Sequence, residues 1–535
     1  MVKKSLATLL FLFFVLPLDA QSYLLKNVSI WTEAGTLQGG CFLLVKDGFI
    51  DSLGPMKALP KGTFDGEYDL KDHFLYPALI DSYNTGFQPS TARKGAEGSE
   101  EAPGPDKNTR LPLEERGFTP RKSLTETLLL KNEDLSKALS RGFTLVHVVP
   151  REGIVGGRTL LLSPISKNPK VNTVSEGPFQ VLRLEPNSSR YPTTISGILA
   201  QIREIKEELL YRHARKDLPP TLSGRRFPYD PELEAFRPLL FGDERFLLVT
   251  NNMVQQRLAE HIGKECPLPP VLLLSPDFWR RPLPSSPIIL PLLFKAPLAS
   301  RYSLEGEEKK REAEERLYPE KFSLLFKERA DIILAPPDSG DYDGLLKNLR
   351  TLLKKGVQEK RLLDSLTVNP ARLFKVQDRY GTLERGKVAD LIVTDRPLLE
   401  EKSRVTITFV EGRPFEFPKV EKGDETPKVD PSGNWSVKAQ GSLGSFSFTM
   451  VLQLEKGNLT GQLFYQGKRF DITEGSVSGD RVSFSARGTL LGDQIMELTF
   501  QGRMADKRIE GTLSLDEGEE SLSLVANPET LGGEM

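Results

Sequence analysis

The strongest constraint on the fold is an alternation of segments between residues 78 and 378. Short apolar runs of strand length alternate there with longer stretches of helical periodicity. This repeated β/α order favours parallel strands with helices packed outside them, and it predicts an α/β fold with a TIM-like (β/α) barrel. The predicted strands are 144–149, 180–184, 246–250, 270–274, 287–294 and 331–335, and the predicted helices are 193–212, 253–263, 305–329 with a break near Pro319, and 343–356.

The first barrel strand is expected just before these segments. The run from Phe74 to Ile80 is broken only by Pro77, and it leads through Asp81 into a polar turn that ends at Gly86. An apolar run followed by a polar, glycine-terminated turn is typical of a buried strand that feeds its loop. We therefore place the entry to the barrel here.

Two short β-rich segments flank the barrel region. Residues 21–77 read as short strands with a hairpin turn at Asp47-Gly48, and residues 379–417 contain alternating apolar positions such as Leu391 and Val393. Neither segment is long enough to bury both faces of a sheet alone. We predict that they combine into one composite β-sandwich.

A separate all-β domain is predicted after a polar linker at residues 418–430. Apolar and polar residues alternate from residue 431 to residue 526, and glycine-containing turns such as Gly467 and Gly479 interrupt the alternation. This pattern indicates an antiparallel meander that closes into a sandwich or a barrel. The predicted segments in full are a signal peptide (1–20), the first part of the composite sandwich (21–77), the barrel (78–378), the second part of the sandwich (379–417), the linker (418–430), the all-β domain (431–526) and a tail (527–535).

Charge and hydropathy limit the partners and the location. The chain has 72 basic and 73 acidic residues, which gives no field to attract nucleic acid. Lys3 and Lys4 precede an apolar run that is too short to span a bilayer, and Ala20 closes it, as in a cleaved signal peptide. We expect an exported protein, periplasmic or secreted, with no membrane span and with an oligomeric state that the sequence leaves open.

Several motifs together resemble one family. They are D-S-Y-N-T-G at 81–86, R-G-F-T-L-V-H-V-V-P at 141–150, L-T-V-N-P-A-R-L-F at 366–374 and G-K-V-A-D-L at 386–391. The chain resembles the amidohydrolase superfamily, and within it an exported bacterial subgroup similar to imidazolonepropionases. The resemblance implies a zinc-type site with a His-x-His pair on the first strand, a bridging Lys or Glu mid-barrel, histidines on strands five and six, and an Asp after strand eight.

The residues at these positions differ from the family's ligands. Tyr83 and Thr85 stand in place of the His-x-His pair, and Asn251 and Ser275 stand at the ends of the fifth and sixth strands. Hydroxyl and amide groups are poor ligands for zinc-type ions. We therefore predict that the ancestral zinc site is lost and that no cofactor replaces it. Asp338 alone matches the family's catalytic Asp, and the four histidines lie elsewhere, at His73, His147, His213 and His261.

Three functions remain open at this point. The first is a catalytically degenerate barrel that acts as a binding or scaffold protein for a small molecule. The second is a hydrolase of a non-peptide carbon-nitrogen bond in a small cyclic amide, with an atypical metal site. Separately, a hard ion such as magnesium or calcium could use oxygens of Asp81, Asp338 and Asp341. In the third, the C-terminal β domain is the ligand-binding module. A further glycine-rich stretch at 153–158 is expected to form a turn.

Overall fold

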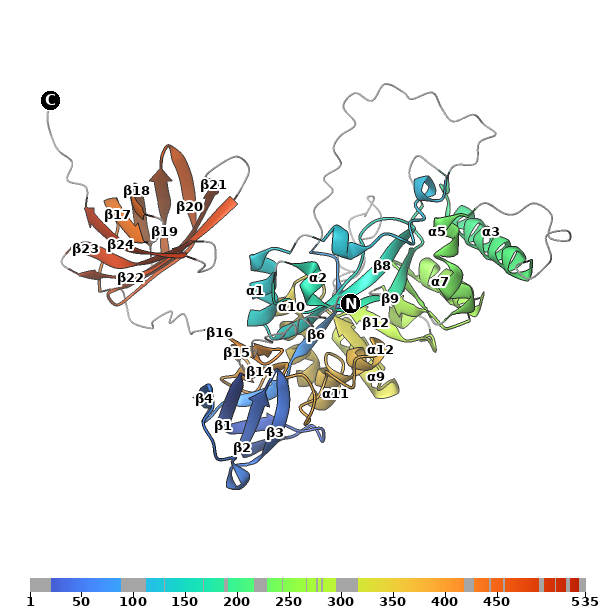
Figure 1. Ribbon diagram of the computed structural model, residues 1–535, viewed down its shortest axis with the longest axis horizontal. Coiled ribbons are helices and arrows are strands. Elements are labelled where there is room, and N and C mark those ends of the chain that lie inside the picture. The colour runs from blue at the N-terminus through green and yellow to red at the C-terminus, as the bar shows by residue number, and fades with distance from the viewer. Residues whose placement is uncertain are drawn as a thin grey trace, which may run out of the picture. The chain divides into compact units, whose positions relative to one another are not determined.

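A computed structural model describes most of the chain (Figure 1). It divides into two compact units, Met1–Phe417 (unit 1) and Pro418–Met535 (unit 2). The predicted signal peptide, most of the linker and most of the tail lie outside the described residues. The described residues are 21–87, 112–128, 130–166, 168–186, 191–215, 229–242, 244–265, 267–275, 278–280, 282–294, 316–417, 428–441, 444–455, 458–489, 495–505, 507–515 and 520–528.

Unit 1 contains a nearly closed barrel of eight strands that follow one another in chain order. The segment after the last strand fills the gap, because Ile80 donates to the Leu366 carbonyl (2.8 Å) and Leu334 to the Ser365 carbonyl (3.2 Å). Neighbouring strands are parallel except that the third is antiparallel to both of its neighbours. The strands are β6 (Leu79–Asn84), β7 (Phe143–Val148), β8 (Val155–Leu162), β9 (Thr173–Arg183), β10 (Phe246–Val249), β11 (Val271–Leu273), β12 (Ile288–Pro291) and β13 (Ile333–Ala335).

Apolar side chains fill the barrel on its inner side and cover it on its outer side. Leu247 and Val249 of β10 face the interior, whereas Leu248 between them packs outward under the helices. Strands that are buried on both faces read as continuous apolar runs, which is why they stand out in the sequence. The interior cluster includes Ile80, Leu145, Phe179, Val181, Leu273, Ile289, Ile333 and Phe374.

Helices surround these strands, and their ends follow local capping chemistry. The Thr194 side chain accepts from Gly197 N and begins α3, and the Asp341 side chain accepts from Gly344 N and begins α10. The helices of unit 1 are α1 (Asn132–Ser140), α2 (Pro169–Asn172), α3 (Ile195–Ala214), α5 (Pro231–Glu234), α6 (Arg237–Phe241), α7 (Met253–Glu265), α9 (Tyr318–Glu328), α10 (Tyr342–Lys354), α11 (Glu359–Asp364) and α12 (Val368–Leu373), with 3-10 turns at Met56–Ala58, Glu114–Arg116, Leu124–Glu126 and Phe278–Arg280. Of the predicted helix 305–329, residues 305–315 lie outside the description.

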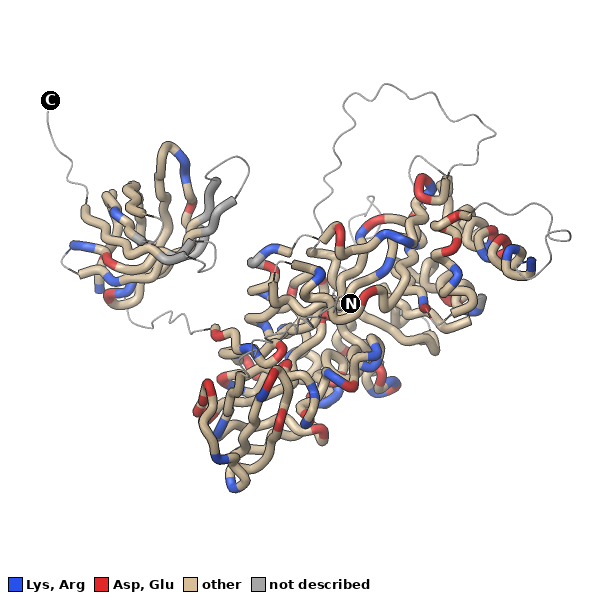
Figure 2. The backbone as a smooth tube through the Cα atoms, in the orientation of Figure 1, with Lys and Arg blue, Asp and Glu red and all other residues tan. Residues whose placement is uncertain are grey.

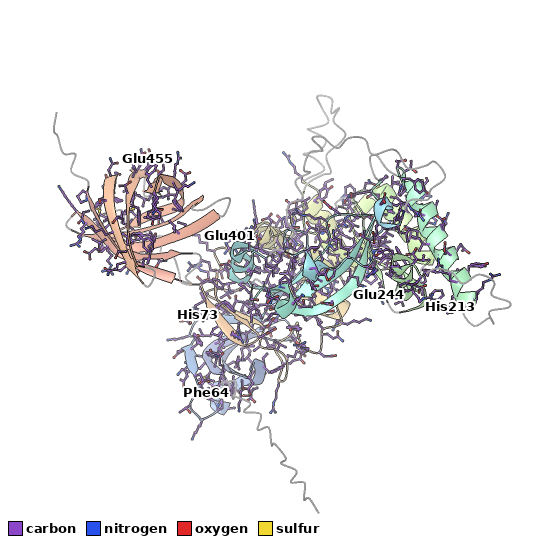
Figure 3. The ribbon with its side chains drawn as sticks, turned by 45° about the horizontal axis from the view of Figure 1, so that its top comes forward. Phe64, His73, His213, Glu244, Glu401 and Glu455 are labelled. Carbon is purple, nitrogen blue, oxygen red and sulfur yellow. The ribbon has the colours of Figure 1, made fainter. Side chains whose placement is uncertain are left out.

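The two flanking segments form one composite sheet in the order β16-β15-β14-β5-β1-β2-β3, with β4 beside β1. The run from Phe74 to Ile80 is not one strand, because it divides at Ala78 between this sheet and the barrel. His73 lies beside this sheet (Figure 3), where its carbonyl accepts from Ser29 N at 3.0 Å. The strands are β1 (Ser22–Trp31), β2 (Leu37–Lys46), β3 (Phe49–Pro55), β4 (Gly66–Asp69), β5 (Phe74–Pro77), β14 (Leu391–Thr394), β15 (Val405–Val410) and β16 (Arg413–Glu416).

Unit 2 is a closed antiparallel barrel in which each strand pairs with the next and β24 pairs with β17. Its interior is filled by its own apolar side chains, including Trp435, Phe470, Phe484 and Phe500. The strands are β17 (Gly433–Gly441), β18 (Gly444–Glu455), β19 (Asn458–Tyr465), β20 (Lys468–Ser478), β21 (Arg481–Thr489), β22 (Ile495–Ala505), β23 (Arg508–Leu515) and β24 (Glu520–Pro528).

Three further observations bear on the sequence predictions. The stretch 153–158 is not only a turn, because β8 begins at Val155 and its two glycines lie in the strand. Cys41 is a buried free thiol, and Cys266 lies outside the described residues. Within the part of the chain that is described, no helix is long and apolar enough to cross a membrane.

Candidate functional site

The predicted site residues lie at one end of the barrel, the mouth, where the parallel strands finish. Tyr83 is the penultimate residue of β6 and Thr85 follows that strand. Asn251 follows β10, Ser275 follows β11 and Asp338 follows β13. Since the carboxyl ends of parallel strands meet at one edge, the fold brings these five positions to the same end.

Thr85 links the first strand to the loop that carries Asp338. Both the backbone nitrogen and Oγ1 of Thr85 lie 2.9 Å from Ser339 Oγ. Asp338 itself has an exposed side chain, and its backbone carbonyl accepts from Asp341 N at 2.9 Å. The Thr85 hydroxyl, at the second ligand position, therefore connects the loop after β6 to the loop after β13.

The residues at strands five and six are also engaged locally. Asn251 is exposed, and its side-chain amide donates to the Glu185 carboxylate. Its backbone nitrogen donates to Gln255 Oε1 at 2.7 Å. Ser275 is buried, and its carbonyl accepts from Phe278 N at 3.1 Å. Neither side chain presents an anionic or imidazole donor to the mouth.

Arg183 is the residue at the mouth that the sequence analysis missed. It ends β9, the fourth strand of the barrel. The side chain is buried, Nη2 donates to the Pro150 carbonyl, and Nη1 has no hydrogen-bond partner among the described residues. The sequence did contain a signal for this residue. Arg183 is a charged residue at the end of an apolar strand, in Q-V-L-R-L-E-P at 180–186.

Tyr83 and Arg183 are electrostatic neighbours. Burial raises the pKa of the Tyr83 phenol, and the positive charge of Arg183 and its hydrogen bond act in the opposite direction. Glu185 raises and Arg151 lowers the same pKa to a smaller extent. The phenol therefore stays protonated at neutral pH, and a fixed guanidinium stands beside the first ligand position.

A buried carboxyl group lies directly behind Tyr83. Asp81 accepts from Tyr83 N (3.2 Å), from Asn84 Nδ2 (2.9 Å) and from the Tyr342 hydroxyl (3.1 Å). Complete burial raises the pKa of Asp81 to about 7, although the three hydrogen bonds oppose this shift. Asp81 therefore anchors the β6 loop and does not face a ligand at the mouth.

His147 lies inside the barrel on β7. Its Nδ1 is 2.8 Å from the Ser82 carbonyl, and its ring packs 4.6 Å from the Phe374 ring and 5.7 Å from the Phe179 ring. Burial lowers the pKa of His147 to about 4. The imidazole is therefore neutral at physiological pH, and as a hydrogen-bonded interior residue it stands apart from the exposed His213 and His261.

The donors at the mouth do not fit the zinc-type ion that the fold family implies. Such ions take imidazole, thiolate or carboxylate ligands. The mouth instead offers a protonated phenol, a bonded hydroxyl and an amide, beside the Arg183 cation. The oxygen set Asp81, Asp338 and Asp341 fits no better, because Asp81 is enclosed and Asp341 caps α10. No three His, Cys, Asp or Glu side chains converge as a metal site anywhere in the described ranges.

A family model and solved structures each match part of this chain. Residues 338–416 match the model of the amidohydrolase family. An amidohydrolase structure from Thermotoga maritima MSB8 is 20% identical with a TM-score of 0.58, covering 74% of this chain and 100% of that one. A putative prolidase from Bifidobacterium longum is 13% identical with a TM-score of 0.42, covering 74% and 95%. No curated protein matches.

Two of the four motifs that suggested the family in the sequence, 366–374 and 386–391, lie inside the matched segment, and those at 81–86 and 141–150 lie outside it. The same segment supplies α12 and the second half of the composite sheet, which belong to the fold shared with the Thermotoga structure. Residues 338–416 therefore match the amidohydrolase family, and the unit that contains them shares the fold of the Thermotoga amidohydrolase structure.

Proposed function

We propose that unit 1 is a catalytically degenerate amidohydrolase-type barrel that binds a small carboxylate at its mouth. One observation carries the proposal: the buried guanidinium of Arg183 lies beside Tyr83, among the positions where the family binds its metal. The barrel then keeps a positive charge at its mouth, but the charge belongs to a side chain. A guanidinium binds carboxylates and cannot activate water as a metal ion does.

Electrostatics support the exchange of metal for arginine. At an effective dielectric constant of about 20 and a separation of ~5 Å, a guanidinium and a divalent ion repel by roughly 7 kcal/mol. Strong ligands would have to offset that repulsion, and Tyr83 and Thr85 are not strong ligands. The same guanidinium attracts an anion, and its planar fork matches the two oxygens of a carboxylate.

The surrounding groups suit a carboxylate ligand. The Tyr83 phenol is protonated and can donate a hydrogen bond, because burial raises its pKa. Arg151 adds positive charge and is exposed at the rim. Glu185 is the opposing charge, and the Asn251 amide already binds its carboxylate. The mouth therefore combines a buried cation and a phenol donor with one carboxylate, Glu185, that is already hydrogen-bonded.

Metal analysis of the purified full chain tests the loss of the metal site. We expect far less than one zinc, iron or manganese ion per chain after dialysis, and no saturable zinc binding by calorimetry. About one tightly held transition-metal ion per chain would overturn the proposal. The hydrolase alternative would then return, and it requires that Asp338→Ala abolish the turnover of a cyclic amide.

Thermal unfolding with a panel of small carboxylates tests the ligand class. We expect a carboxylate to raise the melting temperature of unit 1 and its amide analogue to leave it unchanged. Arg183→Gln should remove the shift. Arg141→Gln should keep it, because Arg141 pairs with Asp343 on the surface at 2.7 Å. Equal shifts for acids and amides, or a shift that survives Arg183→Gln, would contradict this ligand class.

We also propose export to the periplasm or the medium. The motivating feature is the basic, apolar and small-residue order of residues 1–20. Cell fractionation of the full chain and of a variant without residues 2–20 tests it. We expect the full chain outside the cytoplasm and shortened near Ala20, and a full-length chain found only in the cytoplasm would disprove export.

A further inference from the structure

A cleft of about 750 Å³ lies at the end of the barrel opposite the mouth, where the strands begin. We call it the floor cleft. Its walls are the first half of β9, the residues that precede β10, β12 and β13, and the segment 369–379 that includes the end of α12. Ligand sites in proteins commonly have volumes of roughly 300–1,000 Å³. The floor cleft has the size of such a site and is separate from the mouth.

Four basic side chains line the floor cleft, and none of them forms an ion pair within the described part of the chain. They are Arg245, Arg372, Lys375 and Arg379. Arg379 lies over the Tyr380 ring at 5.3 Å, a contact that leaves its guanidinium edge available to a ligand.

The acidic residues of the lining are partly neutralised already. Glu244, which Figure 3 labels on the barrel unit, is paired with Arg158 at 2.6 Å, and Asp331 is paired with Arg329 at 2.6 Å. Glu176 and Asp378 remain, so four cations face two acids that have no ion pair among the described residues. Elsewhere both signs are interspersed along the unit (Figure 2). The cleft therefore has a local excess of positive charge.

Apolar side chains form the base of the floor cleft. Phe179 and Phe374 are both 3% exposed, and Ile333, Leu373 and Val376 extend the apolar surface. A ligand that leaves water here must therefore place an apolar body on these side chains and its charge toward the basic residues.

We propose that the floor cleft binds a small organic anion with an aromatic or similarly apolar body. The arginines supply forked donors for a carboxylate or a sulfonate, and the apolar base accepts a ring. A metal cation does not fit four unpaired basic groups. An extended nucleic acid does not fit a single local cleft on a chain whose net charge is −1. The inference does not depend on the proposed mouth ligand.

The test uses 8-anilinonaphthalene-1-sulfonate as an aromatic anionic probe, titrated by fluorescence into the full chain. We expect saturable binding of one probe per chain that weakens as salt is added. The double variant Arg372→Glu/Arg379→Glu should weaken binding by about tenfold or more, because it reverses two charges of the cleft. The matched control Lys354→Glu/Lys355→Glu reverses two basic charges at the C-terminal end of α10, where both lysines already form surface ion pairs, and its affinity should stay within about twofold.

Competition separates the floor cleft from other sites. Benzoate should displace the probe and benzamide should not. Circular dichroism confirms that each variant is folded before titration. The proposal is overturned by a probe that does not saturate, by equal affinity in the cleft variant and the control, or by binding that is lost in Arg183→Gln, which would assign the probe to the mouth.

Discussion

At the scale of single residues, unit 1 contains two carboxyl groups that burial keeps protonated close to neutral pH. Burial raises the pKa of Asp81 to about 7, and it does the same to Asp390 in front of β14. Three hydrogen bonds to Asp81 do not offset the cost of moving its charge out of water. Asp390 accepts a hydrogen bond from Glu411 N at 2.7 Å, and this contact stabilises the composite sheet.

Asp81 and His147 make stability depend on pH in opposite directions. Between about pH 4 and pH 7 the folded state holds a proton on Asp81 that the unfolded chain has released, so this contribution falls as pH rises. His147 acts in reverse, because its folded pKa of about 4 lies below its unfolded value, and its contribution falls as pH drops from about 6.5 to 4. The two slopes partly cancel in the native protein.

Asp81→Asn should reveal how much Asp81 contributes to the pH dependence of stability. The variant loses the contribution that declines with pH, so its stability relative to the native protein should improve from pH 4 to pH 7 by on the order of 3 kcal/mol. Denaturant unfolding of the full chain at steps of pH measures this difference. Asp343→Asn is the control, because that side chain is exposed in a surface ion pair. Parallel curves for Asp81→Asn and the native protein would show that Asp81 does not titrate in this range.

The positions of the mouth residues could be predicted from the sequence, but their partners could not. Tyr83 and Thr85 sit in a local motif, and Asn251 and Ser275 follow apolar runs that can be counted as strands. Arg183 lies 100 positions after Tyr83, and only the closing of the barrel brings them together. Whether a polar side chain at a strand end points inward depends on register, which a single sequence does not give.

At the scale of elements, β8 is harder to predict from the sequence than the other barrel strands. Strands β10 to β13 are buried on both faces and read as apolar runs. β8 begins with Val155, two glycines and Arg158, which together are typical of a turn. The glycines are there because the strand passes close to neighbouring backbone. A Cβ on Gly156 would lie 2.2 Å from the Glu152 carbonyl oxygen.

Gly156→Ala should therefore destabilise unit 1. The added methyl group meets backbone rather than a flexible side chain, so the β7-β8 connection must shift, at a cost of about 1–3 kcal/mol. The free energy of unfolding from denaturant titration measures the effect. Gly54→Ala on β3 is the matched strand control, because its Cβ would make an ordinary contact with the Phe42 ring at 3.6 Å. If Gly156→Ala lowers the free energy of unfolding no more than Gly54→Ala does, Gly156 does not pack this closely against the Glu152 backbone.

At the scale of the whole molecule, the two units have separate cores. The barrel interior and the composite sheet belong to unit 1, and the cluster around Trp435 contains only residues of unit 2. Every strand of unit 2 pairs within the unit, and the β17-β24 pair leaves no open edge. The alternation in this part of the sequence predicted an all-β sandwich or barrel, and the structure has a closed barrel. Nothing in its pattern gave the number of strands around the barrel, since closure depends on stagger between strands.

A fragment of residues 428–535 should fold alone. The closed sheet and its buried apolar core need no side chain from unit 1, so the fragment should unfold cooperatively. Of the three tryptophans in the chain only Trp435 lies in the fragment, where it is 3% exposed and its indole nitrogen donates to the Pro431 carbonyl at 2.8 Å. Its fluorescence should be blue-shifted in the native fragment and shift to the red in denaturant at the same midpoint as the β-sheet circular dichroism. Trp435→Phe removes the tryptophan fluorescence signal and should leave the circular dichroism transition unchanged.

Two outcomes would contradict independent folding of the fragment. Exposed Trp435 emission in buffer, or a transition without cooperativity, would mean that this barrel depends on the rest of the chain. If the folded fragment also binds none of the ligands of the full chain, unit 2 is not the ligand-binding module.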